Sequence, residues 1–307
     1  MQLMLIAQQK IITALISQLD KHINHHVNAV LHHPVFQRLE STWRGLLMLV
    51  NEAKADKHLL IRFLNVTYHE LNKDVSSASE FDQSQLFKKI YCEELDQPGG
   101  QPFGLLIGDY YFSHQTKNKV RDDIGLLGHI GKIAAAAFAP FVSAVDPSML
   151  GLDCFNEIQS PFKINTIFQL SEYQRWQTLR QDDDARFIGL TLPRILIPKP
   201  YNHQGVAINH RFFKESIEHH GDYLWGNAAY AYGCVVIKCF QENGWLADIR
   251  GLNTHANSGG NISLLHENFH TDAENIAVKC STEYYITDNQ EKIFSEAGFI
   301  ALRDNRF

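Results

Sequence analysis

Three consecutive stretches decide the fold: FGLLIGDYYF (Phe103–Phe112), DDIGLLGHIGKIAAAAFA (Asp122–Ala139) and FVSAV (Phe141–Val145). The first and last are short apolar runs, typical of buried strands, and we expect Gly108 and Asp109 to end the first strand. The middle stretch is long enough for a helix, which Pro140 ends. Strand–helix alternation with continuously apolar strands predicts an α/β fold, with a mixed, mostly buried sheet flanked by helices.

The alternation continues along the rest of the chain. Further strands are expected at HLLIRFLNVTY (58–68), RFIGLTL (186–192), WLADIRG (245–251), NIAVKC (275–280) and FIALR (299–303). Further helices are expected at 84–95, 171–184, 222–244 and 288–298. Gly244 has the position of a helix C-cap. The Pro-rich or polar stretches 193–205 and 252–261 are predicted to be surface excursions.

A long amphipathic helix is predicted over residues 10–31, ahead of a second helix that begins near Pro34. Its apolar residues recur at three- and four-residue steps and form one stripe: Ile12, Leu15, Ile16, Leu19, Ile23, Val27 and Val30. Unless a partner covers it, such a stripe leaves a large apolar patch. We therefore predict that residues 1–33 form a partner-binding helix and that residues 34–307 form the α/β core.

Composition excludes several classes of protein. The chain has 307 residues, of which 45% are hydrophobic, and its net charge of −6 argues against a nucleic-acid partner. Five scattered cysteines suit a reducing compartment. The N-terminus lacks the basic region of a signal peptide, and no apolar run is long enough to span a membrane. The expectation is a soluble, cytoplasmic protein without a membrane span.

The stretch SLLHENFHTD (Ser263–Asp272) contains His266-Glu267-x-x-His270, the pattern with which zinc peptidases bind their metal. That chemistry needs both histidines on one face of a buried helix, with the glutamate as general base. Turn-forming residues flank the pattern closely on both sides, and Thr271 and Asp272 replace the expected apolar continuation. A polar loop is the favoured interpretation, and a zinc-dependent hydrolase is an alternative function.

A nucleotide-binding α/β protein is the second alternative. The segment GLLGHIGKIAAAA places Leu126 and Ile133 where a phosphate-binding loop needs Gly and Ser or Thr. We interpret its glycines at every third position as sites of close helix packing.

The other candidate clusters are interpreted as structural. Cys234 and Cys239 are expected to pack in the core, His22, His25 and His26 to lie on a solvated face, and Asp182–Asp184 to form a solvated turn. No catalytic residue, cofactor site or metal site is predicted.

Several segments resemble, in order, the large subunit of the type VI secretion contractile sheath, the TssC/VipB family. They are LHHPVFQRLESTWRGLLMLV (31–50), SQLFKKIYCEEL…GGQPFGLLIGDYYF (84–112), KIAAAAFAPFVSAVDPSMLG (132–151), FIGLTLPRILIPKPY (187–201), DYLWGNAAYAYG (222–233) and VKCSTEYYITDNQEKIFSEAGFIAL (278–302). Together they span nearly the whole chain from Leu31 onward.

The resemblance implies a structural protein of contractile tail-sheath type without catalytic activity. Members of this family pair with a small sheath subunit (TssB/VipA) and stack with other sheath protomers around a tube of Hcp rings. Contraction drives the tube out of the cell, and the AAA+ unfoldase ClpV then dismantles the sheath. The resemblance also implies that the matching N-terminal helix packs against the small subunit.

The family extends beyond both ends of this sequence. The unfoldase-recognition segment of the family precedes the first helix, and we expect it to be absent from these residues. The C-terminal strands that pair neighbouring protomers follow the position of Phe307, so the core is expected to be incomplete. We therefore expect the chain alone to self-associate, and its complex with the small subunit not to form long tubes.

Overall fold

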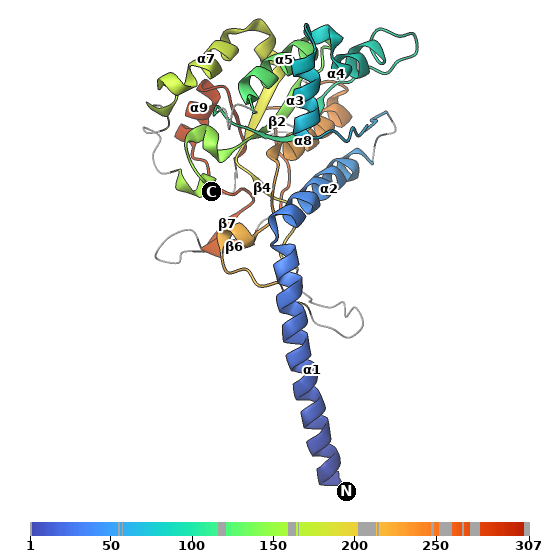
Figure 1. Cartoon of the computed structure of the whole chain (residues 1–307), viewed down its shortest axis with the longest axis vertical. Helices are drawn as coiled ribbons and strands as arrows, with labels where there is room; N and C mark the ends of the chain where they lie inside the picture. Colours follow the sequence, from blue (N-terminus) through green and yellow to red (C-terminus); the bar gives the residue numbers. More distant parts are fainter. Residues whose placement is uncertain are drawn as a thin grey trace.

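The computed structural model describes residues 2–54, 56, 58–115, 121–158, 164, 166–201, 213, 215–246, 249–251, 260–265, 267–270 and 277–303. A layered α/β body holds most of them, and the first helix extends away from it with the N-terminus at its far end (Figure 1).

Four parallel strands form the central sheet, in the order β1–β2–β3–β8. They are β1 (Leu106–Phe112), β2 (Phe141–Val145), β3 (Ile188–Leu192) and β8 (Ile300–Ala301). Every residue of β2 is buried, as expected for a parallel strand with both faces covered. Two antiparallel pairs accompany this sheet: β4 (Ile195–Leu196) with β5 (Trp225–Gly226), and β6 (Glu267–His270) with β7 (Ala277–Cys280). The predicted α/β fold with a mostly buried sheet is confirmed, and the four strands of the central sheet are all parallel, not mixed.

The longer helices are α1 (Gln2–Leu31), α2 (Pro34–Ala53), α3 (Tyr68–Ser77), α5 (Asp123–Ala136), α7 (Gln174–Gln181), α8 (Ala228–Asn243) and α9 (Asp288–Glu296). Shorter helical turns are α4 (Gln85–Phe87), a π-helix at Lys88–Cys92, and 3₁₀ turns at Phe81–Gln83, Pro147–Leu150, Phe155–Glu157, Ser171–Tyr173, Asp183–Phe187 and His220–Asp222.

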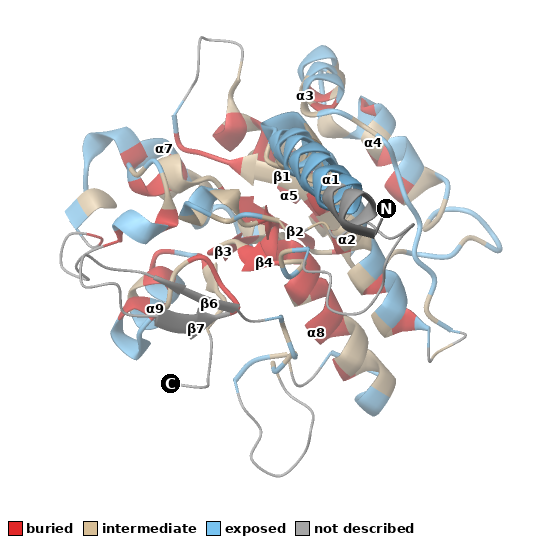
Figure 2. Ribbon diagram, turned by 90° about the horizontal axis from the view of Figure 1, so that it is seen from below, coloured by how far each residue is buried: buried red, intermediate tan, exposed pale blue. Residues whose placement is uncertain are grey.

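Helices cover both faces of the central sheet. Leu106 packs into the same apolar core as Leu127 of α5. Its neighbour Ile107 instead packs against α8, where a Cβ added to Gly233 would lie 2.5 Å from the Ile107 side chain. Adjacent residues of a strand point to opposite faces, so α5 and α8 lie on opposite sides of the sheet. α2 packs against the outer side of α8, and the buried residues gather at the centre of the body around the strands (Figure 2).

A bulge in β1 explains two fully buried polar side chains. The register of β1 against β2 shifts between Ile107 and Tyr111, which leaves carbonyl groups without ladder partners. Ser143 Oγ lies 2.8 Å from the carbonyl oxygens of both Gly108 and Tyr110, so its single hydroxyl hydrogen can donate to either. Asn227 Nδ2 donates to the same two carbonyls at 3.3 and 3.2 Å. The strand therefore continues through Gly108 and Asp109, and the expectation that these residues end it is wrong.

Several local signals acted as predicted. Pro34 occupies the first turn of α2, and Gly244 ends α8 in the left-handed conformation at φ 71°. A Cβ on Gly131 of α5 would lie 2.9 Å from Ile188 of β3, which confirms close packing at that glycine. Cys234 and Cys239 are buried, as expected for core residues, and Asp182 and Asp183 lie in an exposed turn.

Three expectations about local structure are wrong. Residues 58–67 form extended chain outside any sheet, and most of their apolar side chains are exposed. The described residues between 245 and 251 form no strand. The 193–205 stretch contains β4, whose two residues are buried, because it enters a small sheet with β5. The helix predicted over 10–31 is confirmed, and it begins already at Gln2. Residues 252–259 of the other predicted excursion lie outside the described residues.

Candidate assembly interface

The apolar stripe of α1 is exposed to solvent. The exposed fractions of its exposed members lie between 37% for Val27 and 59% for Leu15, and Ile23 is partly covered. The exposed members are Ile12, Leu15, Ile16, Leu19, Val27 and Val30. Nothing in the described part of the chain packs over them, and in Figure 2 the helix is exposed along almost all of its described length. Removing apolar surface from water is favourable, so a stripe of this length favours a partner.

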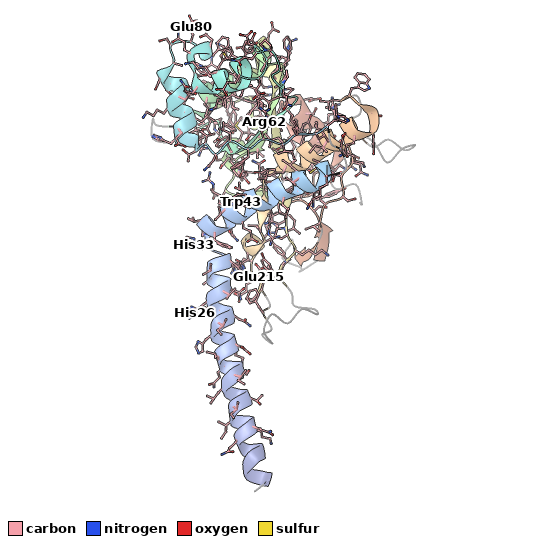
Figure 3. The ribbon with its side chains drawn as sticks, turned by 90° about the vertical axis from the view of Figure 1, so that its right-hand side faces the viewer. His26, His33, Trp43, Arg62, Glu80 and Glu215 are labelled. Atoms are coloured by element: carbon pink, nitrogen blue, oxygen red, sulfur yellow. The ribbon has the colours of Figure 1, made fainter. Side chains whose placement is uncertain are left out.

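Within the described residues, the contacts that tie α1 to the body lie near its C-terminal end. His32 Nε2 lies 2.9 Å from Glu215 Oε1, and Asn28 Oδ1 accepts a hydrogen bond from the Ser216 amide at 3.2 Å. His33 then caps α2 by accepting from the Val35 amide at 3.3 Å. Figure 3 shows His33 at the junction of the two helices and Glu215 beside it. The helix is thus anchored at its base, and its stripe is exposed in the described part of the chain.

The inner face of α2 fits closely against α8. Its buried residues recur every four positions: Ser41, Gly45, Leu49 and Ala53. A Cβ on Gly45 would lie 2.3 Å from the ring of Tyr230, so only glycine permits this approach.

A polar node fixes α2 to the bulge of β1. Asp109 Oδ2 accepts from Thr42 Oγ1 at 2.5 Å, and its Oδ1 accepts from Asn227 at 3.3 Å. The Tyr230 hydroxyl also bonds to Asp109. Burial, together with the charge of this carboxylate, raises the pKa of Tyr230 well above its usual value, so the hydroxyl stays a donor. One carboxylate therefore joins β1, α2 and α8.

The outer face of α2 is apolar as well. Val35, Leu39, Trp43, Leu47 and Val50 recur at steps of three and four and are 72%, 55%, 58%, 52% and 39% exposed. A surface helix of a single-chain protein normally places charged and polar residues on that face. Two apolar faces on one helix therefore indicate that α2 lies between its own core and another surface.

Residues 59–66 extend this apolar surface beyond α2. Leu60 and Phe63 are 65% and 61% exposed, and the Phe63 ring lies 6.2 Å from that of Trp43. Arg62 points away toward Glu94 and stacks over Phe103 at 5.6 Å. Figure 3 labels Trp43 on α2 and Arg62 on the neighbouring segment. Sequence reasoning missed both surfaces: it interpreted 58–68 as a buried strand and considered only the start of α2.

A charged group borders the same surface near the base of α2. Arg44 Nε donates to Glu40 at 2.7 Å, and the Tyr201 hydroxyl donates to the same carboxylate at 2.6 Å. Burial alone would lower the pKa of Arg44, but Glu40 and Tyr201 outweigh it and raise that pKa. Arg44 is therefore a permanent cation at the rim of the apolar face.

The zinc-peptidase pattern lies on a strand. Glu267–His270 form β6, which pairs with β7, and His266 lies outside the described residues. The expectation of a loop is wrong. Residues 267–270 are extended and not helical, and positions four apart along a strand lie about 13 Å from each other, too far for two ligands of one metal ion.

The remaining chemical candidates lie apart from one another in the described part of the chain. Gly125, Gly128 and Gly131 belong to α5, where Gly125 faces its own cap residue Asp122. His25 and His26 stand on the exposed helix α1 with ring centres 5.8 Å apart. Within the described ranges, no three His, Cys, Asp or Glu residues are placed to hold a metal ion. The same residues contain no helix that is long and apolar enough to cross a membrane.

A closed α/β core that carries apolar surface on α1, α2 and residues 59–66 defines a subunit of a larger protein assembly. Residues 13–306 match the VipB family model, described as EvpB/VC_A0108, tail sheath N-terminal domain, and the chain belongs to this family. It is 39% identical over 298 residues to the type VI secretion system sheath protein TssC1 of Pseudomonas aeruginosa, an alignment that covers 95% of this chain. The chain spans 58% of the length of that relative. The resemblance identified from the sequence is confirmed.

Proposed function

We propose that this protein is a structural subunit of a type VI secretion contractile sheath and pairs through α1 with the small sheath subunit. Family membership supports the role, and the exposed stripe of α1 is the observation that supports the mode of pairing. The pairs would stack with other sheath protomers around the Hcp tube in the cytoplasm. The protein would act by assembly and contraction, without catalysis, and the unfoldase ClpV would recycle the contracted sheath.

The geometry of α1 suits a helix-on-helix interface. Its anchors at Asn28 and His32 lie at the base, so the stripe from Ile12 to Val27 is presented as a long, straight surface. Helices that bury such stripes interlock side chains at three- and four-residue spacing. A partner helix of similar length would cover the stripe while the polar face stays in water.

The test is co-expression with the small sheath subunit, followed by co-purification. The double variant L19D/I23D places two charges inside the stripe and should abolish pairing, because each buried carboxylate would lack a partner. The matched control is Q18D/H22D, which adds the same residues with the same spacing on the polar face and should pair normally. Equal pairing by both variants would place the partner surface elsewhere on the chain. Equal loss by both would attribute the effect to charge or helicity and not to the stripe.

A further inference from the structure

Residues Leu59–Val66 have the composition of a strand and the geometry of an extended chain, but they belong to no sheet. Within the described residues, no backbone hydrogen bond joins them to another part of the chain. Among the described side chains, the Tyr110 hydroxyl reaches their main chain and donates to the Val66 carbonyl at 2.7 Å. Unpaired backbone along an extended apolar segment is what an added strand uses for pairing.

The segment is held in place at its middle and its end. Arg62 donates to Glu94 and to Gln101, the latter at 2.9 Å, while the Thr67 side chain caps α3 directly after the segment. These contacts are made by side chains, so they fix the course of the segment and leave its backbone groups available. Because these contacts already order the segment in the single chain, pairing with a partner would lose less conformational entropy.

Phe63 continues the surface of α2, because its ring adjoins that of Trp43. In an extended chain the exposed residues Leu60 and Leu64 lie on the opposite side, together with Arg62. The α2 face begins at Val35, five residues after Val30 of the α1 stripe. A chain that covers α1 and continues along α2 would reach residues 59–66.

We propose that Leu59–Val66 pair with a β-strand supplied by the partner that covers α1. This inference rests on the proposed function, since the small sheath subunit is the occupant. The recognised element is an extended segment with apolar side chains on alternate positions. Its backbone would bond to residues 59–66, and the side chains on one of its faces would cover Phe63 and Trp43.

Amide hydrogen exchange of the free chain and of the co-purified complex tests the pairing. In a strand paired on one side, alternate amides point to the partner. Either residues 60, 62, 64 and 66 or residues 59, 61, 63 and 65 should therefore exchange more slowly in the complex, by about tenfold or more. The other set should change less.

Proline scanning gives a second, independent readout. Proline removes one N–H. Within the described residues no amide of the segment donates a backbone hydrogen bond, so the free chain should fold normally. The amides of residues 64 and 65 point in opposite directions in a strand, so only one of L64P and N65P should weaken pairing, by about tenfold. The matched controls L64A and N65A keep the amide and should show no such difference between positions.

Each result has a defined meaning. A complex that forms with unchanged exchange at residues 59–66 overturns the strand pairing and leaves the α1 proposal standing. Equal effects of proline and alanine at both positions would show side-chain docking only, and also overturn it. Slow exchange in the free chain would show pairing with a second copy or within the chain, which contradicts the proposal. Absence of any complex with the small subunit would overturn the proposed function together with this inference.

Discussion

Replacing Gly45 with alanine should destabilise the protein, even though glycine is a poor residue for a helix. In an exposed helix interior, Gly→Ala stabilises by about 1 kcal/mol, because alanine loses less backbone entropy on folding. At Gly45 the added methyl group would lie 2.3 Å from Cδ2 and 2.4 Å from Cε2 of Tyr230. The outcome therefore depends on whether that ring can move.

The surroundings of Tyr230 prevent a cheap adjustment. The residue is only 6% exposed, and its hydroxyl is bonded to Asp109, which also accepts from Thr42 and Asn227. A shift of the ring would disturb this node or push α2 away from α8. Overpacking a closed site costs about 1–3 kcal/mol, so the net effect of G45A should be a loss of about 1 kcal/mol.

Gly128 on α5 provides the matched control. A Cβ there would lie 3.4 Å from the Leu179 side chain, which is ordinary contact, so G128A should stabilise by up to about 1 kcal/mol. Urea unfolding of both variants, followed by circular dichroism, should separate them by about 2 kcal/mol in the free energy of unfolding. If G45A is as stable as G128A, then α2 is not packed on Tyr230 as described and its outer face need not be the exposed one.

Three further outcomes are expected. E283Q should lower the free energy of unfolding by about 3–5 kcal/mol, because Glu283 is buried and its carboxylate accepts two 2.5 Å bonds from Arg194. The control is the exposed pair of Asp183 and Arg186. In the same urea titration D183N should leave the free energy of unfolding unchanged. Burial lowers the pKa of His114 in the folded protein, although the charge of Glu172 opposes this. At acidic pH the unfolded chain therefore binds more protons at this residue than the folded protein does. The free energy of unfolding should fall as the pH drops below about 6.5. H114F, which keeps the stacking on Tyr173, should lose less stability between pH 7 and 5, and an unchanged slope would assign the acid sensitivity to other groups. Elemental analysis of the purified protein should find no stoichiometric zinc, and one equivalent that disappears in H266A would restore the hydrolase hypothesis.

Local signals determined much of the fold from the sequence alone. The runs at 103–112, 122–139 and 141–145 form β1, α5 and β2. Short apolar runs favour strands, and a longer run that ends at a proline favours a helix, so the type of each element follows from local sequence. Pro34 and Gly244 marked helix ends because each restricts or permits backbone angles wherever it stands. The family also followed from the order of its segments, and the stripe of α1 was visible as a helical period.

Tertiary structure alone decided which apolar segments are covered. Residues 58–68 and the run at Ile188–Leu192 look alike in sequence, but only the second enters the sheet, because strand pairing is made with residues far away in the chain. The same holds for Ile195, which is buried in a stretch with the composition of a surface loop. Only the structure shows that α2 has a second, exposed apolar face, because its inner face is already filled by Tyr230. A hydrophobic period shows that a face must be buried, whereas what buries it depends on contacts between distant segments and between chains.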